Sequence, residues 1–423
     1  MDLDRRVQVR LHRTGGDGTG FGSGYLIAPR LVLTAGHVVA GPGTVSVCLP
    51  GRGPERFPAV VRWYRRDART DTALLEVSEE RGWLPPESLA GLRARTPQRW
   101  GAMIGPRPLS VTTHGFPRVR REAEAGGPQD EQVEVTLRPG AGSLAGRYEL
   151  VGADAPVPGQ LPLPAGGTLW SGMSGAAVLA GDLLCGVVRR DRQAGGGTRL
   201  TATPAAVLLA DPEFRAHVGA HTGREPWVEP AEPARLLSPA EWDDDLRSPA
   251  MPPGAEAEAV GFRGRHEELR VLAAWCADPA PFAVHVLTGP GGRGTSRPAR
   301  QLAGMLRRTG WVTGRLRPDL RDVPAAPPGG PGAPAAARPG FAHEDGPDLS
   351  TLDTHHWLLL VVDDADTRPQ VVRRLVEHLS TTRHRVRLLL LARSDGEWRT
   401  DVMGASAQCR HLLARAPVHV TTA

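Results

Sequence analysis

Short hydrophobic segments separated by glycine and proline fill the first half of the chain. Alternating or continuous apolar runs of this length predict β-strands. Before residue 120 the predicted strands cover 7–11, 22–27, 31–38, 45–49, 59–64, 73–77 and 111–117. After it they cover 133–137, 147–151, 176–179 and 183–188. An exposed loop is expected at 118–132 and a helix at 205–218, so the pattern indicates an all-β domain closed by one helix.

The pattern changes after residue 218. Residues 219–257 are rich in proline, glutamate and alanine and predict a linker with one short helix. An amphipathic helix is expected to about Cys276. Continuous apolar strands follow at 284–287, 357–362 and 386–391, with a Pro/Gly/Ala-rich loop at 323–340. Such strands are typical of a parallel sheet covered on both faces. The chain is therefore predicted to be multidomain, with an all-β domain at 1–218, the linker at 219–257 and an α/β domain at 258–423.

Length and charge narrow the class of partner. A chain of 423 residues is long enough for two cores. The net charge is 51 − 46 = +5, which is mild for this length. Every basic residue is arginine, asparagine is absent, and isoleucine occurs only at Ile27 and Ile104. This bias is typical of a GC-rich coding sequence, so the basic balance is poor evidence for nucleic acid, and no nucleic-acid partner is expected.

The cysteines and the hydrophobic stretches bear on the compartment. The four cysteines are far apart and form no C-x-x-C pair, at Cys48, Cys185, Cys276 and Cys409. This favours buried thiols in a reducing compartment over a metal site or disulfides. The first residues are charged and resemble no secretory signal. No stretch approaches 18 apolar residues, so no membrane partner is expected. The sequence predicts a cytoplasmic protein.

Three residues of the first half form a possible catalytic set. Ser174 lies between Gly172-Met173 and Gly175, on a tight turn before an apolar run. In such a turn the backbone N–H groups can converge where an oxyanion develops. His37 ends an apolar run in Leu-Thr-Ala-Gly-His-Val, and Asp71 precedes the buried run 73–77. Each alone is more often structural, but the order histidine, aspartate, serine completes a set. An α/β-hydrolase would need the serine first and a glycine where Ala176 stands.

Four motifs resemble the landmarks of trypsin-like serine peptidases over about residues 1–215. They are Phe21-Gly-Ser-Gly, Thr34-Ala-Gly-His-Val, Asp71-Thr-Ala-Leu-Leu and Gly172-Met-Ser-Gly. The resemblance implies two six-stranded antiparallel β-barrels with the active site between them. It also implies a triad of His37, Asp71 and Ser174, an oxyanion hole made by the N–H groups of Gly172 and Ser174, and a peptidase reaction without a cofactor. By the family's spacing Thr168 lies near the base of the primary specificity pocket, so no preference for arginine or lysine is expected.

A second set of motifs lies in the predicted α/β domain. The strand 284–287 leads into a glycine-rich loop that includes Gly289, Gly294, Thr295 and Ser296. This is the layout that wraps phosphates with backbone N–H groups. The strand 357–362 ends at Asp363 and Asp364, where a Mg²⁺ ligand is expected. Together with Gly261-Phe-Arg-Gly-Arg, these motifs resemble the P-loop NTPase module of the STAND class, in truncated form, over 258–423.

The glycine-rich loop differs from the NTPase motif at the position that binds phosphate. Thr295 stands where the phosphate-binding lysine belongs, and Pro298 falls in the first turn of the next helix. Ser296 and Asp363 are the expected Mg²⁺ ligands. Weak ATP and Mg²⁺ binding with little hydrolysis is expected, together with self-association through this module.

Two functions are consistent with these motifs. The first is a serine endopeptidase that acts on a protein or peptide substrate and is coupled to a nucleotide-binding switch. The second is a peptide-binding scaffold that keeps the barrels but cuts nothing and carries a defunct NTPase. The intact histidine, aspartate and serine favour the first.

Overall fold

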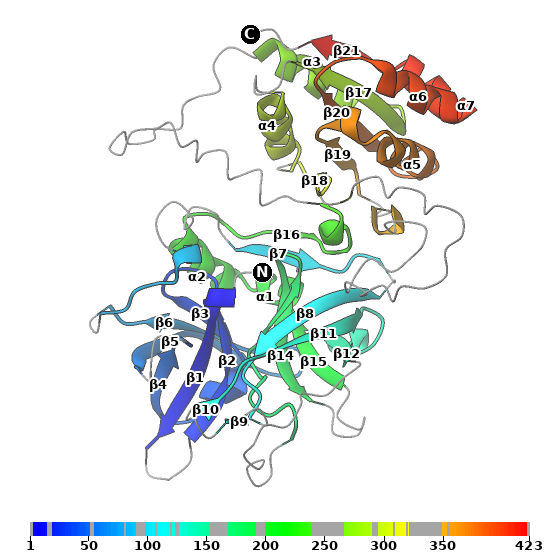
Figure 1. The fold of residues 1–423 in the computed structure, drawn as a ribbon. Coiled ribbons are helices and arrows are strands. Elements are labelled where there is room, and N and C mark those ends of the chain that lie inside the picture. Colours follow the sequence, from blue (N-terminus) through cyan, green and yellow to red (C-terminus); the bar gives the residue numbers. More distant parts are fainter. Residues whose placement is uncertain are drawn as a thin grey trace. The chain divides into compact units, whose positions relative to one another are not determined.

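The computed structural model divides into two compact units, Met1–Ala234 and Arg235–Ala423, which are described separately (Figure 1). The structure describes residues 3–14, 19–50, 55–79, 82–89, 98–105, 108–118, 121–122, 127–152, 168–191, 199–237, 266–289, 295–307, 309–318, 320, 349–352 and 356–420.

Six antiparallel strands close the first barrel, in blue in Figure 1. They are β1 (Arg6–Arg13), β2 (Thr19–Leu26), β3 (Leu31–Thr34), β4 (Gly43–Cys48), β5 (Phe57–Arg66) and β6 (Asp71–Val77). Their order around the barrel is β1-β2-β3-β6-β5-β4. In β1 the buried Val7, Val9 and Leu11 alternate with half-buried polar residues. This period of two places one side of each strand in the barrel interior.

A second ring of six strands follows. The second sheet of the first unit has eight strands: β7 (Arg99–Ala102), β8 (Leu109–Gly115), β11 (Glu131–Arg138), β12 (Tyr148–Gly152), β13 (Ala177–Ala180), β14 (Leu183–Asp191), β15 (Arg199–Pro204) and β16 (Val228–Pro230). Strands β13-β8-β11-β12-β15-β14 form the ring, which the β13–β14 pairing closes. Strands β7 and β16 extend the sheet beyond β14. The expected double barrel is thus present.

The two barrels share a core. Residues that point out of the first barrel, Leu31, Leu33 and Leu74, are buried in one cluster with Leu179 and Val187 of the second. Helices α1 (Ala205–Leu209) and α2 (Pro212–Thr222) cover the same cluster, to which Phe214 contributes. Strands β3 and β6 are therefore buried on both faces, which explains their continuous apolar pattern.

Three details of the first unit differ from the predicted pattern. The expected helix 205–218 is two helices, because Asp211 caps α2 through its side chain and Pro212 occupies the first turn. The expected loop 118–132 contains a small pair of strands, β9 (Arg121–Glu122) and β10 (Gly127–Pro128), and the start of β11. The expected linker begins with ordered structure, since β16 and the 3₁₀ helix Glu232–Arg235 follow α2.

The segment after α2 is ordered because its polar groups are paired within the first unit. Arg99 of β7 forms ion pairs with Glu229 of β16 and with Asp182, the latter at 2.9 Å. Glu232 Oε1 accepts the N–H groups of Ile104 and Gly105 at 2.8 and 2.7 Å. The division between the two compact units falls after Ala234, and the predicted domain bounds 1–218, 219–257 and 258–423 stay a prediction.

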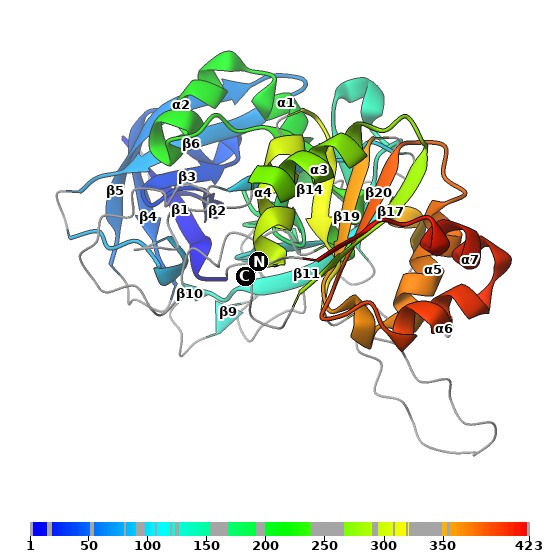
Figure 2. The same ribbon diagram turned by 90° about the horizontal axis from the view of Figure 1, so that it is seen from above.

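The second unit is a five-stranded parallel sheet with helices on both faces. Its strands are β17 (Phe282–Thr288), β18 (Val312–Arg315), β19 (Leu358–Val362), β20 (Val386–Ala392) and β21 (Val418–Val420), in the order β18-β19-β20-β17-β21. Figure 2 shows α3 (His266–Ala277) and α4 (Ser296–Arg307) on one face. On the other face lie α5 (Pro369–Leu379), α6 (Glu397–Ala405) and α7 (Ala407–Ala414).

Alternate residues of the central strands pack against the helices on opposite faces of the sheet. Leu358, Leu360 and Val362 of β19 belong to the cluster that contains the apolar residues of α5, α6 and α7. Leu359 and Val361 belong to the cluster under α3 and α4. Burial on both faces accounts for the continuous hydrophobic run. The unit has α/β architecture, as predicted. Among the described residues, no helix is long and apolar enough to cross a membrane.

Candidate active site

His37 and Asp71 meet at the end of the first barrel. His37 lies in the 3₁₀ helix Gly36–Val39, directly after β3, and Asp71 begins β6, which pairs with β3. His37 Nδ1 lies 2.8 Å from Asp71 Oδ2, and the His37 backbone N–H donates to Oδ1 at 2.8 Å. A β-carbon on Gly36 would lie 3.0 Å from Asp71 Oδ1. The glycine before the histidine therefore leaves room for the carboxylate.

Burial differs between the two side chains. The Asp71 side chain is 8% exposed and the His37 side chain is 31% exposed. Burial raises the pKa of the Asp71 carboxyl, but hydrogen bonds and charge from His37, with a smaller effect of Arg189, outweigh it and lower the pKa below its ordinary value. A buried, ionised aspartate thus faces one ring nitrogen of a histidine whose ring reaches the surface.

Ser174 lies against β2 of the first barrel, although it belongs to the second barrel. The Ser174 carbonyl accepts the N–H of Ser23 in β2 at 2.8 Å. A β-carbon on Gly22 would lie 2.7 Å from that carbonyl oxygen and 2.5 Å from Val38 Cγ2, next in the chain to His37. At Gly175, where φ is +91°, a β-carbon would lie 2.0 Å from Ser23 O and 2.9 Å from the N of Ala35. This close approach requires glycine after the serine.

The backbone of the serine turn alternates between bonded and unbonded N–H groups. The N–H groups of Ser171, Met173, Gly175 and Ala176 donate to backbone carbonyls. Within the described part of the chain, the N–H groups of Gly172 and Ser174 have no acceptor. Gly172 has a φ of +102°. This backbone conformation is one that glycine adopts readily and other residues rarely do. The two N–H groups predicted to form an oxyanion hole are therefore the two in this turn that can still donate a hydrogen bond to a substrate.

Ser23 is a site residue that the motif analysis did not single out. Its hydroxyl donates to the Gly172 carbonyl at 2.7 Å and accepts the N–H of Phe116 at 2.9 Å. Ser23 is fully buried. It therefore contacts the carbonyls of both Gly172 and Ser174, from the other barrel. Its place between glycines in Phe21-Gly-Ser-Gly was the signal available in the sequence.

Thr168, the predicted specificity residue, lies at the start of the serine turn. Its backbone N–H donates to Ser171 Oγ at 2.8 Å, and its carbonyl accepts the N–H of Ser171 at 3.0 Å. From 168 to 176 the turn carries no charged side chain. The expectation of a preference other than arginine or lysine stays a prediction.

The predicted nucleotide residues lie at the carboxyl edge of the second unit's sheet. Gly289 follows β17, Thr295 precedes α4 and Ser296 begins it. Gly294 lies outside the described residues. Asp363 and Asp364 follow β19, and β20 separates that strand from β17. Two strand spacings amount to about 10 Å, so the two halves of the predicted site face each other across one strand.

These residues do not fit a nucleotide-bound Mg²⁺ ion as they stand. Asp363 Oδ2 lies 3.1 Å from Arg315 Nη1 of β18. The predicted metal ligand therefore already has a cationic partner, while Thr295 supplies no charge for the phosphates. The described residues contain no group of three or more metal-ligating side chains.

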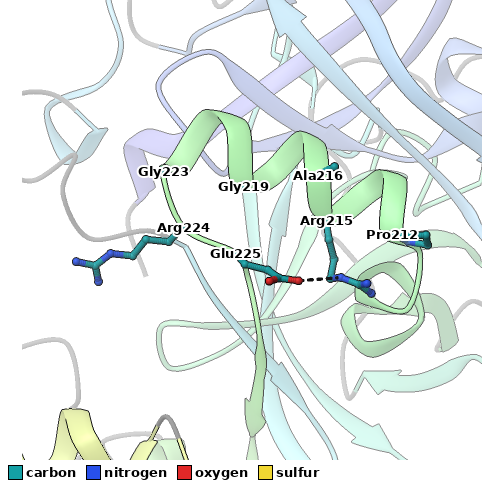
Figure 3. A pocket seen from close by; sticks show the side chains of 7 residues that line it. All are labelled: Pro212, Arg215, Ala216, Gly219, Gly223, Arg224 and Glu225. Carbon is teal, nitrogen blue, oxygen red and sulfur yellow. Dashed lines mark ion pairs between the residues drawn. The ribbon is translucent and has the colours of Figure 1, made fainter.

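The shallow pocket beside α2 in Figure 3 lies apart from these sites in the sequence. Pro212, Arg215, Gly219, Gly223 and Glu225 contribute to its lining. Arg215 and Glu225 form an ion pair of 3.4 Å across it. It contains no predicted site residue.

Several comparisons relate the chain to known proteins. No curated protein matches it in sequence. Among solved structures, the active form of the Rv3671c protease from M. tuberculosis is 20% identical, with a TM-score of 0.35, over 53% of this chain and 83% of that one. Its inactive form is 21% identical, with a TM-score of 0.32, over 52% and 89%. The serine endoprotease from Yersinia pestis is 17% identical, with a TM-score of 0.33, over 51% and 64%.

The family comparison covers the segment that carries the motifs. Residues 22–183 match the model of the trypsin-like peptidase domain. That range contains His37, Asp71 and Ser174 and the strands from β3 to β13, but not β1, β15 or most of β14. The first unit of this chain therefore carries a trypsin-like peptidase domain.

Proposed function

We propose that the first unit is a serine endopeptidase that cleaves peptide bonds through an acyl-enzyme. The observation that carries this proposal is the double hydrogen bond from His37 to Asp71, next to a serine turn with two available N–H groups. Because Asp71 Oδ2 accepts from Nδ1–H, the neutral ring has its lone pair at Nε2. That nitrogen is then the acceptor for the Ser174 hydroxyl proton.

The proposed reaction follows from these positions. Ser174 Oγ attacks the scissile carbonyl carbon as its proton passes to His37 Nε2, and Asp71 stabilises the resulting imidazolium. The negative carbonyl oxygen receives hydrogen bonds from the N–H groups of Gly172 and Ser174. His37 then gives its proton to the leaving amine. Water, activated in the same way, attacks the ester carbon and releases Ser174.

A fluorophosphonate probe tests the proposal because it reacts only with an activated serine. We expect labelling of Ser174 in the pure protein and its loss in Ser174→Ala and His37→Ala. The matched control is His12→Ala, since His12 contacts Ser46 in the first barrel and not the site; it should label normally. A folded wild type that does not label would favour the alternative, a peptide-binding scaffold that cuts nothing.

For the second unit we propose weak nucleotide binding with little or no hydrolysis. A parallel strand, β17, leads by way of a glycine-rich segment into the N-terminus of the 12-residue helix α4, and such an arrangement favours phosphate. The missing lysine at Thr295 and the Arg315–Asp363 pair weaken the hold on phosphate and metal. Coupling of this unit to the peptidase, self-association and a cytoplasmic location are parts of the same proposal.

Calorimetry with ATP and Mg²⁺ tests the nucleotide proposal. We expect weak heat signals for the wild type and tighter binding for Thr295→Lys, which restores the mobile cation that follows the phosphates. The control is Thr309→Lys, which lies just after α4 and is remote in sequence from the glycine-rich loop. Tight binding by the wild type would show that an arginine replaces the lysine, and binding by neither form would mean that the site is defunct.

A further inference from the structure

Arg189 of β14 is the extra residue of a β-bulge. Val188 pairs with Ala202 of β15 and Arg190 pairs with Thr201, so Arg189 has no opposite residue. A bulge changes the direction of the side chain at the extra residue. Here the guanidinium of Arg189, which belongs to the second barrel, reaches the turn at 67–70 in the first.

The guanidinium binds three consecutive carbonyls of that turn. Nη1 donates to the carbonyls of Ala68 and Arg69 at 3.3 and 3.1 Å, and Nη2 donates to the carbonyl of Asp67 at 3.3 Å. Arg189 Nε lies 4.0 Å from Asp71 Oδ2. The whole residue is only 6% exposed. Arginine is rarely buried to this extent without partners, and the planar fork of its donors suits several acceptors at once.

The turn that Arg189 contacts leads directly into Asp71. Within it, Asp67 N donates to the Thr70 carbonyl at 2.7 Å, and Asp67 Oδ1 accepts the N–H groups of Arg69 and Thr70. The turn is therefore one closed unit, and a shift of its carbonyls moves the residue that follows. We propose, on the basis of the peptidase function proposed above, that Arg189 is a positioning residue: it clamps this turn and places its charge beside Asp71.

The charge has a separate consequence for the site. The charged groups that face the Asp71 carboxylate are His37 from the 3₁₀ helix and Arg189 from β14. On the β15 side the neutral Thr203 Oγ1 accepts the N–H of Asp71 at 3.4 Å. Arg189 stabilises the carboxylate and repels a further proton on the His37–Asp71 pair. Removing its charge therefore makes that pair easier to protonate, and protonation of His37 stops the reaction.

Two substitutions distinguish the hydrogen bonds of Arg189 to the turn at 67–70 from the effect of its charge on Asp71. Arg189→Lys keeps the charge but lacks the fork, and Arg189→Gln removes the charge. The rate of fluorophosphonate labelling is measured from pH 5 to 9 on the full chain. For Arg189→Lys we expect a rate about 10- to 100-fold lower, from misplacement of the triad, with the acid limb of the profile unmoved. For Arg189→Gln we expect a lower rate and an acid limb displaced to higher pH.

The matched control is Arg147→Gln. Arg147 also donates to the Ala68 carbonyl, at 3.0 Å from Nη2, so this change removes a guanidinium from the same turn. Its acid limb should match the wild type. Circular dichroism checks the fold of each variant, and if Arg189→Gln does not fold, the rate of Arg189→Lys alone decides.

The outcomes are distinct from those that test the peptidase function, because they are read only after the wild type has been shown to label on Ser174. An undiminished rate in Arg189→Lys overturns the proposal. A reduced rate with an unmoved acid limb in Arg189→Gln also overturns it, since loss of packing alone would give that result.

Discussion

At the scale of single residues, the serine turn depends on a side chain from the opposite barrel. Ser23 donates its hydroxyl proton to the Gly172 carbonyl and accepts the N–H of Phe116, and its own N–H donates to the Ser174 carbonyl. The Gly172 carbonyl belongs to the peptide that precedes Met173, so its anchoring restricts rotation at Gly172. Ser23 thereby helps to fix the conformation of the serine turn at Gly172.

Ser23→Ala should slow the reaction of the site while the fold persists. The change removes both hydroxyl contacts and leaves the buried Phe116 N–H without its acceptor, which costs about 1–3 kcal/mol of stability. We expect the rate of fluorophosphonate labelling at Ser174 to fall about 10- to 100-fold, somewhat less than the loss of a whole oxyanion donor. In the proposed reaction, the phosphoryl oxygen of the probe accepts from the same N–H groups as a substrate oxyanion.

The control for this change is Ser143→Ala. Ser143 is exposed, and among the described residues its hydroxyl donates only to the carbonyl of Gly140 in the same loop, so removal of the hydroxyl should leave labelling unchanged. A Ser23→Ala protein that unfolds only slightly earlier yet labels at the wild-type rate would contradict a positioning role for Ser23.

At the scale of elements, the strands were predicted where burial follows a simple period. Strands β1, β3 and β6 appear in the sequence as alternating or continuous apolar runs because each has one or both faces in a core. Strand β16 has no such pattern, since Val228 is exposed and the strand depends on β7 and on the Arg99–Glu229 ion pair. Arg99 and Glu229 are 130 residues apart in the chain. Such a contact leaves no pattern in the local sequence, so the segment that contains β16 was predicted to be a linker.

The same reasoning explains which candidate site residues could be predicted from the sequence. His37, Asp71 and Ser174 lie in short motifs at strand ends, and the strand pairing that brings His37 and Asp71 together follows from β3 and β6. In the sequence, Arg189 only follows the apolar run 183–188, and nothing there indicates a role for it. Its role depends on the bulge in β14, which is defined by the register against β15. Register arises from pairing between strands and cannot be inferred from one strand alone.

In the second unit, the predicted strands and carboxylates are present, but the ion pair between Asp363 and Arg315 was not predicted. The run 357–362 predicted a buried strand ending in Asp363, which β19 confirms. The ion pair of Asp363 with Arg315 arises because β18 lies next to β19 in register. Arg315 comes from a strand of only four residues, for which the sequence analysis made no prediction.

At the scale of the whole chain, each unit contains a buried histidine that resists protonation. Burial and the charge of Arg6 lower the pKa of His114 in the first unit to about 4, although Asp130 opposes them. Burial, with a smaller effect of His419, lowers the pKa of His285 in β17 of the second unit to about 4. His285 is 1% exposed, and neither ring nitrogen has a hydrogen-bond partner among the described residues. Both units should therefore lose stability in acid.

The sign of this effect follows from the two pKa values of each histidine. An unfolded histidine titrates near pH 6.5, whereas the folded pKa of His285 is about 4. Above pH 6.5 the ring is neutral in both states and contributes no pH dependence. Between pH 6.5 and 4 the unfolded chain binds a proton that the folded chain does not, so stability falls as the pH falls, by at most about 3 kcal/mol for His285.

His285→Leu should remove this dependence from the second unit. Leucine buries an apolar side chain against Trp275, whose ring lies 5.2 Å from that of His285, and it carries no proton. In calorimetry of the full chain at pH 7 and pH 5, we expect the wild-type transitions to move to lower temperature in acid. In His285→Leu one transition should move less, while the one that contains His114 moves as before. If both transitions of the variant shift as in the wild type, His285 is not a source of the acid sensitivity.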